Sequence, residues 1–109
     1  MKVLDLTQKL DLRPLSLANA ERELCGVYIG DLLSWVMGRA SCDNVWITIM
    51  SNINIVAVAA LADVGCIILA EGVTLDESVC ATAKQKGINV LTTEKTAYEI
   101  AAELARLGL

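Results

Sequence analysis

The residues with the most chemical potential in this chain are short polar clusters, each of which follows an apolar run. If the runs are parallel strands, the clusters lie together at the carboxyl ends of the strands, where helix amino termini offer free amide groups to small polar ligands. Helix capping by the same side chains is the simpler explanation, except for Asn54, because Ser51 or Asn52 already caps its helix. A small-ligand site at this edge would consist of Gly30, Asp31, Ser51, Asn52, Asn54, Glu71, Gly72 and Thr92.

Acid–base catalysis at this edge would depend on carboxylates, because the chain contains no histidine. Asp31 and Glu71 can approach each other across adjacent strand ends, as in a catalytic carboxylate pair, but acidic residues in loops are more often simply solvated. The chain also lacks the glycine-rich loops that bind nucleotide phosphates and the Gly-x-Ser-x-Gly turn of a nucleophile elbow. We therefore expect no catalytic residue, no cofactor and no enzymatic activity.

The four cysteines are spaced too widely for a Cys-x-x-Cys pair, so we also expect no metal site. Cys25 and Cys66 fall inside predicted strands, where a thiol acts as a small core hydrophobe. Cys42 and Cys80 fall outside the strands, but no cation adjacent in sequence favours a reactive thiolate. All four are expected to be ordinary reduced thiols.

A buried strand–helix–strand unit over residues 44–70 is predicted at the centre of the fold. Val45 to Met50 and Cys66 to Leu69 are continuous apolar runs, which is typical of strands covered on both faces. The helix predicted between them, from Ile53 to Val64, contains a single charged residue, Asp63. It would be only ~18 Å long against a hydrocarbon core of ~30 Å, so a membrane span is not expected.

The flanking segments add an edge strand, two further strands and four helices. Val3, Leu6 and Leu10 predict a short amphipathic helix, and Pro14 confines the strand from Leu12 to Leu17 to the edge of the sheet. Further strands are predicted at Cys25 to Ile29 and at Ile88 to Leu91.

The starts and ends of the later helices are predicted from capping signals. Leu32 to Met37 forms a short helix that closes near Gly38. Thr74 and Glu77 have the spacing of a capping box, and Gly87 suits the end of that helix. Thr92 or Thr93 would cap the last one. The pattern predicts an α/β fold, a three-layer α/β/α sandwich with a mostly parallel central sheet of four to five strands.

Length and charge limit the organisation and the partners. A chain of 109 residues predicts one domain over residues 1–109, and its formal charge of −4 argues against nucleic acid. The amino terminus lacks the basic and apolar regions of a signal segment, so a cytoplasmic location is expected.

Two helices carry more apolar surface than one sheet face can cover, which indicates a homodimer. The expected dimer interface is drawn from Leu33, Trp35, Val36, Met37, Val56 and Ala60. The alternative is that the amino-terminal helix and the Leu12 to Leu17 segment cover this surface.

The order of strands and turns resembles the DRTGG domain over residues 24 to about 106. The family turn Gly-Asp-Arg corresponds here to Met50-Ser51-Asn52, and the family strand end Thr-Gly-Gly corresponds to Ala70-Glu71-Gly72. Only Gly72 matches, so no role of the Asp-Arg pair carries over to this chain. The resemblance is carried by residues 27 to 31, 46 to 52, 57 to 61, 66 to 72 and 89 to 93.

The resemblance implies a non-catalytic module with a regulatory or dimer-forming role. Such domains are attached to phosphotransacetylase and to CBS-domain pyrophosphatases, and a related form begins HPr kinase. Stand-alone versions of similar length are often called serine kinases, a label that this chain contradicts because it lacks a nucleotide-phosphate loop. Some of them occur near genes for iron hydrogenases. Two alternatives therefore stay open: a sensor of a small metabolite or nucleotide at the strand ends, and an accessory subunit of a larger, hydrogenase-type redox enzyme complex.

Overall fold

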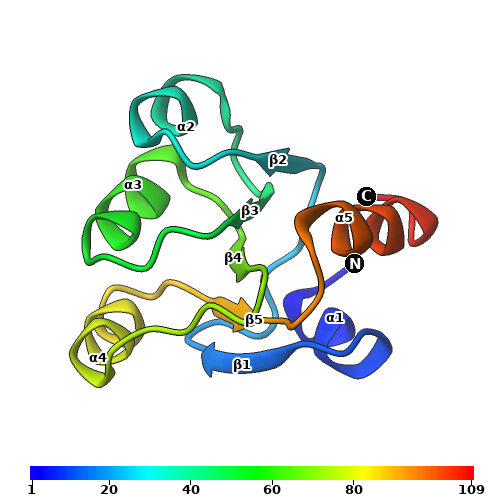
Figure 1. The fold of residues 1–109 in the computed structure, drawn as a ribbon, viewed down its shortest axis with the longest axis horizontal. Coiled ribbons are helices and arrows are strands. Elements are labelled where there is room, and N and C mark those ends of the chain that lie inside the picture. The colour runs from blue at the N-terminus through cyan, green and yellow to red at the C-terminus, as the bar shows by residue number, and fades with distance from the viewer.

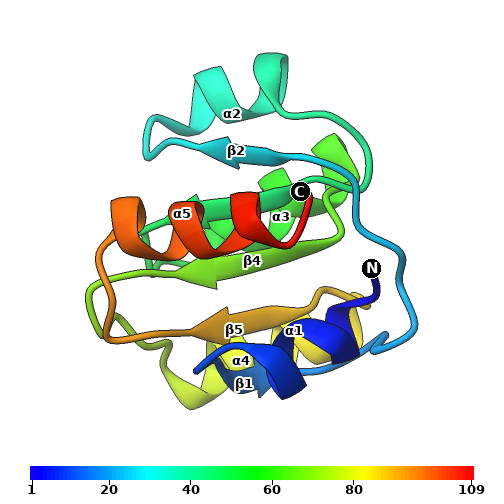
Figure 2. The same ribbon diagram turned by 90° about the vertical axis from the view of Figure 1, so that its right-hand side faces the viewer.

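The computed structural model describes the whole chain, residues 1–109, as a five-stranded sheet between two layers of helices (Figures 1 and 2). In chain order the elements are α1 (Val3–Lys9), β1 (Arg13–Ser16), β2 (Val27–Ile29), α2 (Leu33–Arg39), β3 (Val45–Thr48), α3 (Asn54–Ala62), β4 (Cys66–Leu69), α4 (Glu77–Gln85), β5 (Val90–Thr92) and α5 (Ala97–Arg106). This arrangement confirms the predicted α/β fold class.

The sheet has the strand order β1-β5-β4-β3-β2. β2, β3, β4 and β5 run parallel, and β1 pairs with β5 in the antiparallel direction, with Arg13 opposite Thr92. Pro14 lies in this edge strand, as predicted, because its nitrogen cannot donate to a second neighbour. The amino end of β1 therefore lies beside the carboxyl end of β5. Residues before β1 and after β5 thus lie together at the end of the sheet where the parallel strands finish, called here the carboxyl edge.

The two faces of the sheet are covered by different helices. α2, α3 and α4 lie on one face, and α1 and α5 lie on the other, with both chain termini on that second side (Figure 2). Trp46, Ile67 and Val90 point into the first core, whereas Ile47 and Ile68 point into the second. Every residue of β3 and β4 is buried, which explains why their sequences are apolar without alternation.

The predicted start of α4 is wrong. Its N-cap is Asp76, the helix begins at Glu77, and no side chain caps it, so Thr74 and Glu77 do not form a capping box. Its predicted end is confirmed, because Gly87 follows the helix with a left-handed φ of +76°.

The predicted cap of α5 is also wrong. Thr92 and Thr93 are buried in and just after β5, whereas Thr96 accepts from the Glu99 amide, and the Glu99 carboxylate accepts from the Thr96 amide. The signal Thr-x-x-Glu was present in the sequence, but two earlier threonines competed for the same role.

The prediction for Cys25 is wrong as well, whereas that for Cys66 is confirmed. Cys25 lies before β2 and is exposed, because β2 begins only at Val27. Cys66 is fully buried in β4, and burial raises the pKa of its thiol to about 12. None of the five helices has the length and apolar composition needed to cross a membrane.

Candidate functional site

The predicted residues at the carboxyl edge are mostly occupied by the fold itself. One carboxylate oxygen of Asp31 accepts from the hydroxyl of Thr48 at 2.8 Å and from the amide of Ile49 at 3.0 Å. Gly30 supplies the carbonyl that accepts from the indole of Trp46 at 2.9 Å. These bonds tie the loop after β2 to the end of β3, so Asp31 has a structural role at this edge.

Asp31 and Glu71 do not form the predicted carboxylate pair. β3 lies between β2 and β4, so the ends of their two strands are not adjacent. Glu71 and Gly72 instead form a tight turn with φ values of +61° and +74°. Their amides donate to the carbonyls of Lys95 at 2.9 Å and Thr93 at 2.8 Å, which fixes the segment after β5.

The remaining residues of the predicted site divide between local hydrogen bonds and solvent. The predicted cap of α3 by Ser51 or Asn52 is wrong, because the N-cap is Ile53 and no side chain caps the helix. Asn52 instead accepts from the amide of Asn54 at 2.9 Å in the turn before the helix. Ser51 and Asn54 are exposed and make no side-chain hydrogen bond. Thr92 is buried, and its hydroxyl donates to the carbonyl of Val73 at 2.6 Å. The eight predicted residues therefore line one edge but do not enclose a common cavity.

A polar hollow of about 160 Å³ lies at the same edge, between the start of β1 and the end of β5. Thr92 is the only residue of the predicted site that lines it. Sequence reasoning missed Asp11 and Arg13 because only the antiparallel direction of β1 brings them to the carboxyl end of β5, and nothing in the local sequence fixes that direction. The hollow is lined by Asp11, Arg13, Thr92, Thr93 and Glu94.

The predicted dimer residues differ in their exposure. Val36 and Val56 are 0% and 3% exposed, so their side chains belong to the core and are excluded from any surface. Trp35 and Met37 are half exposed, and Leu33 and Ala60 are partly and largely accessible. The guanidinium of Arg39 lies 3.6 Å from the centre of the Trp35 ring, which orients the indole at the surface.

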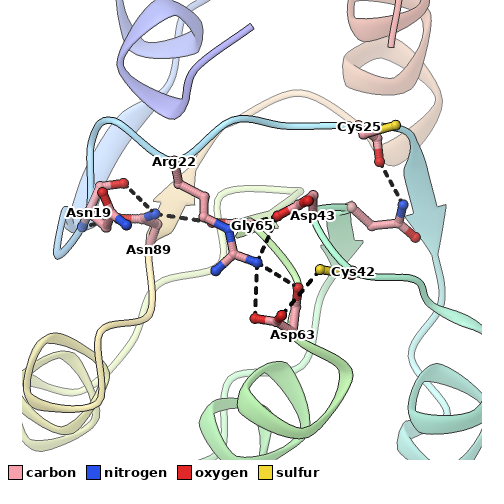
Figure 3. A network of polar contacts seen from close by, with 9 residues as sticks. Asn19, Arg22, Cys25, Cys42, Asp43, Asp63, Gly65 and Asn89 are labelled. Carbon is pink, nitrogen blue, oxygen red and sulfur yellow. Dashed lines mark hydrogen bonds and ion pairs between the residues drawn. The ribbon is translucent and has the colours of Figure 1, made fainter.

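A polar network around Arg22 lies at the amino ends of the parallel strands, called here the amino edge (Figure 3). Its guanidinium donates to the Asp43 carboxylate at 2.9 Å, and to the carbonyl and the carboxylate of Asp63 at 2.9 and 3.0 Å. Both aspartates have a left-handed backbone, with φ values of +66° and +55°. The network thus fastens the two turns that precede β3 and β4.

Cys42 joins this network, and the contact changes the acidity of both partners. Its thiol donates to the second carboxylate oxygen of Asp63 at 3.1 Å. The bond from Cys42, together with Arg22, lowers the pKa of Asp63, and the same carboxylate raises the pKa of Cys42. A raised thiol pKa is the opposite of what an activated nucleophile requires, so the contact with Asp63 does not activate Cys42.

Asn89 extends the same edge toward β1. Its amide group donates to the carbonyls of Asn19 at 2.8 Å and Gly65 at 3.0 Å, and its oxygen accepts from the Asn19 amide at 2.8 Å. Asn89 is 2% exposed and fully bonded, as a buried side chain needs to be. The amino edge of the sheet is therefore structural, and the chain holds no group of three or more potential metal ligands.

A mostly parallel sheet between two helix layers, with loops organised by their own hydrogen bonds, defines a small α/β domain. The chain belongs to the DRTGG domain family, whose model matches residues 20–107. This confirms the resemblance in the strand order, although only Gly72 retains the motif. A search of curated proteins gives no match.

Among solved structures the chain is similar to the CBS and DRTGG domains of the regulatory region of Clostridium perfringens pyrophosphatase, complexed with the activator diadenosine tetraphosphate. The TM-score is 0.70 at 15% sequence identity, over 93% of this chain and 44% of that chain. The chain thus spans less than half of the related structure, and the likeness establishes the fold.

Proposed function

We propose that this chain is a non-catalytic regulatory domain that acts as a homodimer. The observation that carries the proposal is a group of apolar side chains, each about half exposed, on and beside α2. Membership of a family with a relative in the regulatory region of a pyrophosphatase supports the regulatory part. The group, called here the apolar patch, consists of Ile29, Leu32, Trp35, Met37, Ile49 and Ile53, which are between 47% and 58% exposed.

The members of the patch lie on segments that contact one another within the chain. Ile29 ends β2, and Leu32 follows after one short turn into α2. The bond from the Ile49 amide to Asp31 brings the end of β3 to that turn. α2 and α3 pack side by side, with Ile53 at the start of α3 (Figure 1). A small soluble monomer seldom exposes so many large apolar side chains together, which favours burial in a symmetric interface.

The absence of catalysis is proposed from the state of the polar groups. The carboxylate of Asp31 is held by Thr48 and Ile49, and the carboxylate of Asp63 is held by Arg22 and Cys42. Both carboxylates are thus engaged by the protein, and the pKa of Asp63 is lowered, which is the opposite of what a general acid near neutral pH needs. Their geometry favours a structural role.

The dimer is tested by native mass spectrometry and light scattering at micromolar concentration. We expect twice the monomer mass of 11.7 kDa for the wild type and a monomer for Trp35→Glu, because a carboxylate cannot be buried unpaired in an apolar interface. Tyr98→Glu is the matched control, since Tyr98 is an 81% exposed aromatic residue on α5 and outside the patch.

Two results would contradict the proposal. A dimeric Trp35→Glu protein would place the interface elsewhere. A monomeric wild type would refute self-association and favour the accessory-subunit role, in which the patch contacts a larger protein.

A second candidate function is the sensing of a small ligand. The hollow at the carboxyl end of β5 favours it, because this edge is where ligands bind in parallel α/β sheets. The related pyrophosphatase region was solved with a nucleotide activator, which is a further reason to look for a ligand here.

A further inference from the structure

The polar hollow between β1 and β5 has a floor of buried threonines and walls that carry charges. Thr92 and Thr93 are each 4% exposed. The hydroxyl of Thr92 donates to the carbonyls of Val73 and Leu69. The hydroxyl oxygen of Thr93 accepts from the amide of Lys95 at 3.2 Å, but its own proton has no acceptor in the protein. Among the residues that line the hollow, Thr93 therefore keeps one hydroxyl donor that the protein does not use.

The walls hold one cation and two anions that the protein leaves without partners. Asp11 lies on the segment before β1, Arg13 lies in β1, and Glu94 follows β5. The ion pairs of the chain all involve other residues, so none of these three charges is paired. Two carboxylates of like charge thus border one small hollow, an arrangement that a bound cation would stabilise.

Gly72 makes room for this arrangement. A Cβ atom at Gly72 would lie 2.5 Å from the carboxylate of Glu94, and its φ of +74° disfavours any other residue. The amide of Gly72 also fixes the carbonyl of Thr93. The one residue that matches the family motif thus lies against the Glu94 carboxylate at the border of the hollow.

We propose that this hollow binds a compact zwitterion that carries one ammonium group and one carboxylate, such as a small α-amino acid. The carboxylate of the ligand pairs with the guanidinium of Arg13, and its ammonium group bridges Asp11 and Glu94. The free proton of Thr93 donates to the ligand carboxylate. This assignment deepens the small-ligand role proposed above and does not depend on the dimer.

Other ligand classes fit the charges less well. A phosphate would face two carboxylates and a single guanidinium, which is an unfavourable balance. A divalent metal would have only two carboxylates and would lie beside the positive charge of Arg13. A volume of about 160 Å³ also holds an amino acid more readily than a nucleotide.

The experiment is a titration of the ¹⁵N-labelled full chain with glycine, the smallest molecule that has both groups. We expect saturable shifts of the amides at Arg13, Thr93 and Glu94. Acetate and methylammonium, which each carry half of the zwitterion, should bind about tenfold more weakly or worse. Arg13→Gln and Glu94→Gln should each weaken glycine binding by about tenfold, while Arg106→Gln, a control on the exposed face of α5, should not change it.

Two outcomes overturn the assignment: no saturable shift with glycine, and equal binding of glycine by the wild type and by Arg13→Gln. The spectra of the variants show whether each one is folded, so a loss of binding is not confused with unfolding. The dimer is measured separately by mass, and therefore a failure of this site and a failure of the proposed homodimer are distinguishable.

Discussion

At the residue scale, the carboxylate of Asp63 raises the pKa of a nearby thiol. Cys42 is exposed, but its bond to Asp63 raises its pKa, so less of the reactive thiolate is present near neutral pH. Cys66 is protected in a different way, because it is buried in β4. Exposure alone therefore does not rank the thiols of this chain.

We expect Asp63→Asn to accelerate alkylation of Cys42 at pH 8, because the amide removes the negative charge that disfavours the thiolate. The measurement is the rate of iodoacetamide modification at each cysteine, followed by peptide mass spectrometry. The rate at exposed Cys25 serves as the internal control and should not change. An unchanged rate at Cys42 would show that Asp63 does not determine its acidity.

The ion pair of Arg22 with Asp63 should make the free energy of unfolding depend on pH in the acidic range. The pKa of Asp63 is lowered by Cys42 and Arg22, so this contribution is present above the ordinary carboxyl pKa of about 3.9 and is lost as the pH falls through the lowered value. We expect Arg22→Met to reduce the free energy of unfolding by about 1 kcal/mol at pH 7.

The difference in the free energy of unfolding between Arg22→Met and the wild type should narrow below about pH 4, as Asp63 becomes protonated. Urea unfolding of both proteins at several pH values measures this difference. Arg106→Met, which removes an exposed arginine without an ion pair, is the control. A difference that stays constant from pH 7 to pH 3 would mean that packing of the Arg22 stem, and not its charge, stabilises the turns.

At the element scale, the sequence predicts strands better than it predicts helix starts. Val45 to Thr48 and Cys66 to Leu69 are buried on both faces, so their apolar runs carry a strong signal. Pro14 marks the edge strand for an equally local reason. A helix start depends instead on which of several polar residues the backbone places at the N-cap, and tertiary contacts decide this. Thr92 and Thr93 are buried in and just after β5, so neither is available as a cap, and Thr96 caps α5 instead.

Thr96→Ala and Thr74→Ala should therefore differ in their effects on stability. Thr96 accepts from the Glu99 amide and completes a capping box, so its loss should cost about 1 kcal/mol. Thr74 is exposed and caps no helix, so its replacement should change the free energy of unfolding by less than about 0.5 kcal/mol. Denaturant unfolding of the two variants measures both values. Equal costs would contradict the observed start of α4.

At the scale of the whole molecule, the sequence predicted the layers but not the contacts between distant segments. The Arg22 network joins residues that are 21 and 41 positions apart, and the hollow joins Asp11 to Glu94. Neither leaves a local pattern of spacing, because both depend on the direction of β1 and on the order of the strands. The edge of the sheet that carries the polar clusters was predictable from the ends of the apolar runs. The particular residues that line a cavity there were not.

The amino-terminal segment should be required for folding, although the family match begins only at residue 20. Val3, Leu6 and Leu12 are 0%, 0% and 6% exposed, and β1 pairs with β5. Burial of each of these side chains contributes about 1.5–3 kcal/mol, against a total stability of about 5–15 kcal/mol for a domain of ordinary size. We expect deletion of residues 1–18 to leave the chain largely unfolded at 25 °C, as measured by circular dichroism and thermal melting.

Deletion of residues 108–109 is the matched control and should preserve cooperative unfolding, because Gly108 is exposed and Leu109 is only partly buried against the second core. A truncated chain that still melts cooperatively near the wild-type temperature would show that residues 19–109 fold alone. In that case the first 18 residues would be an accessory strap, and the prediction of a single domain over residues 1–109 would be wrong. Loss of the melting transition would instead mean that β1 completes the core, and that the hollow beside it is present only in the intact domain.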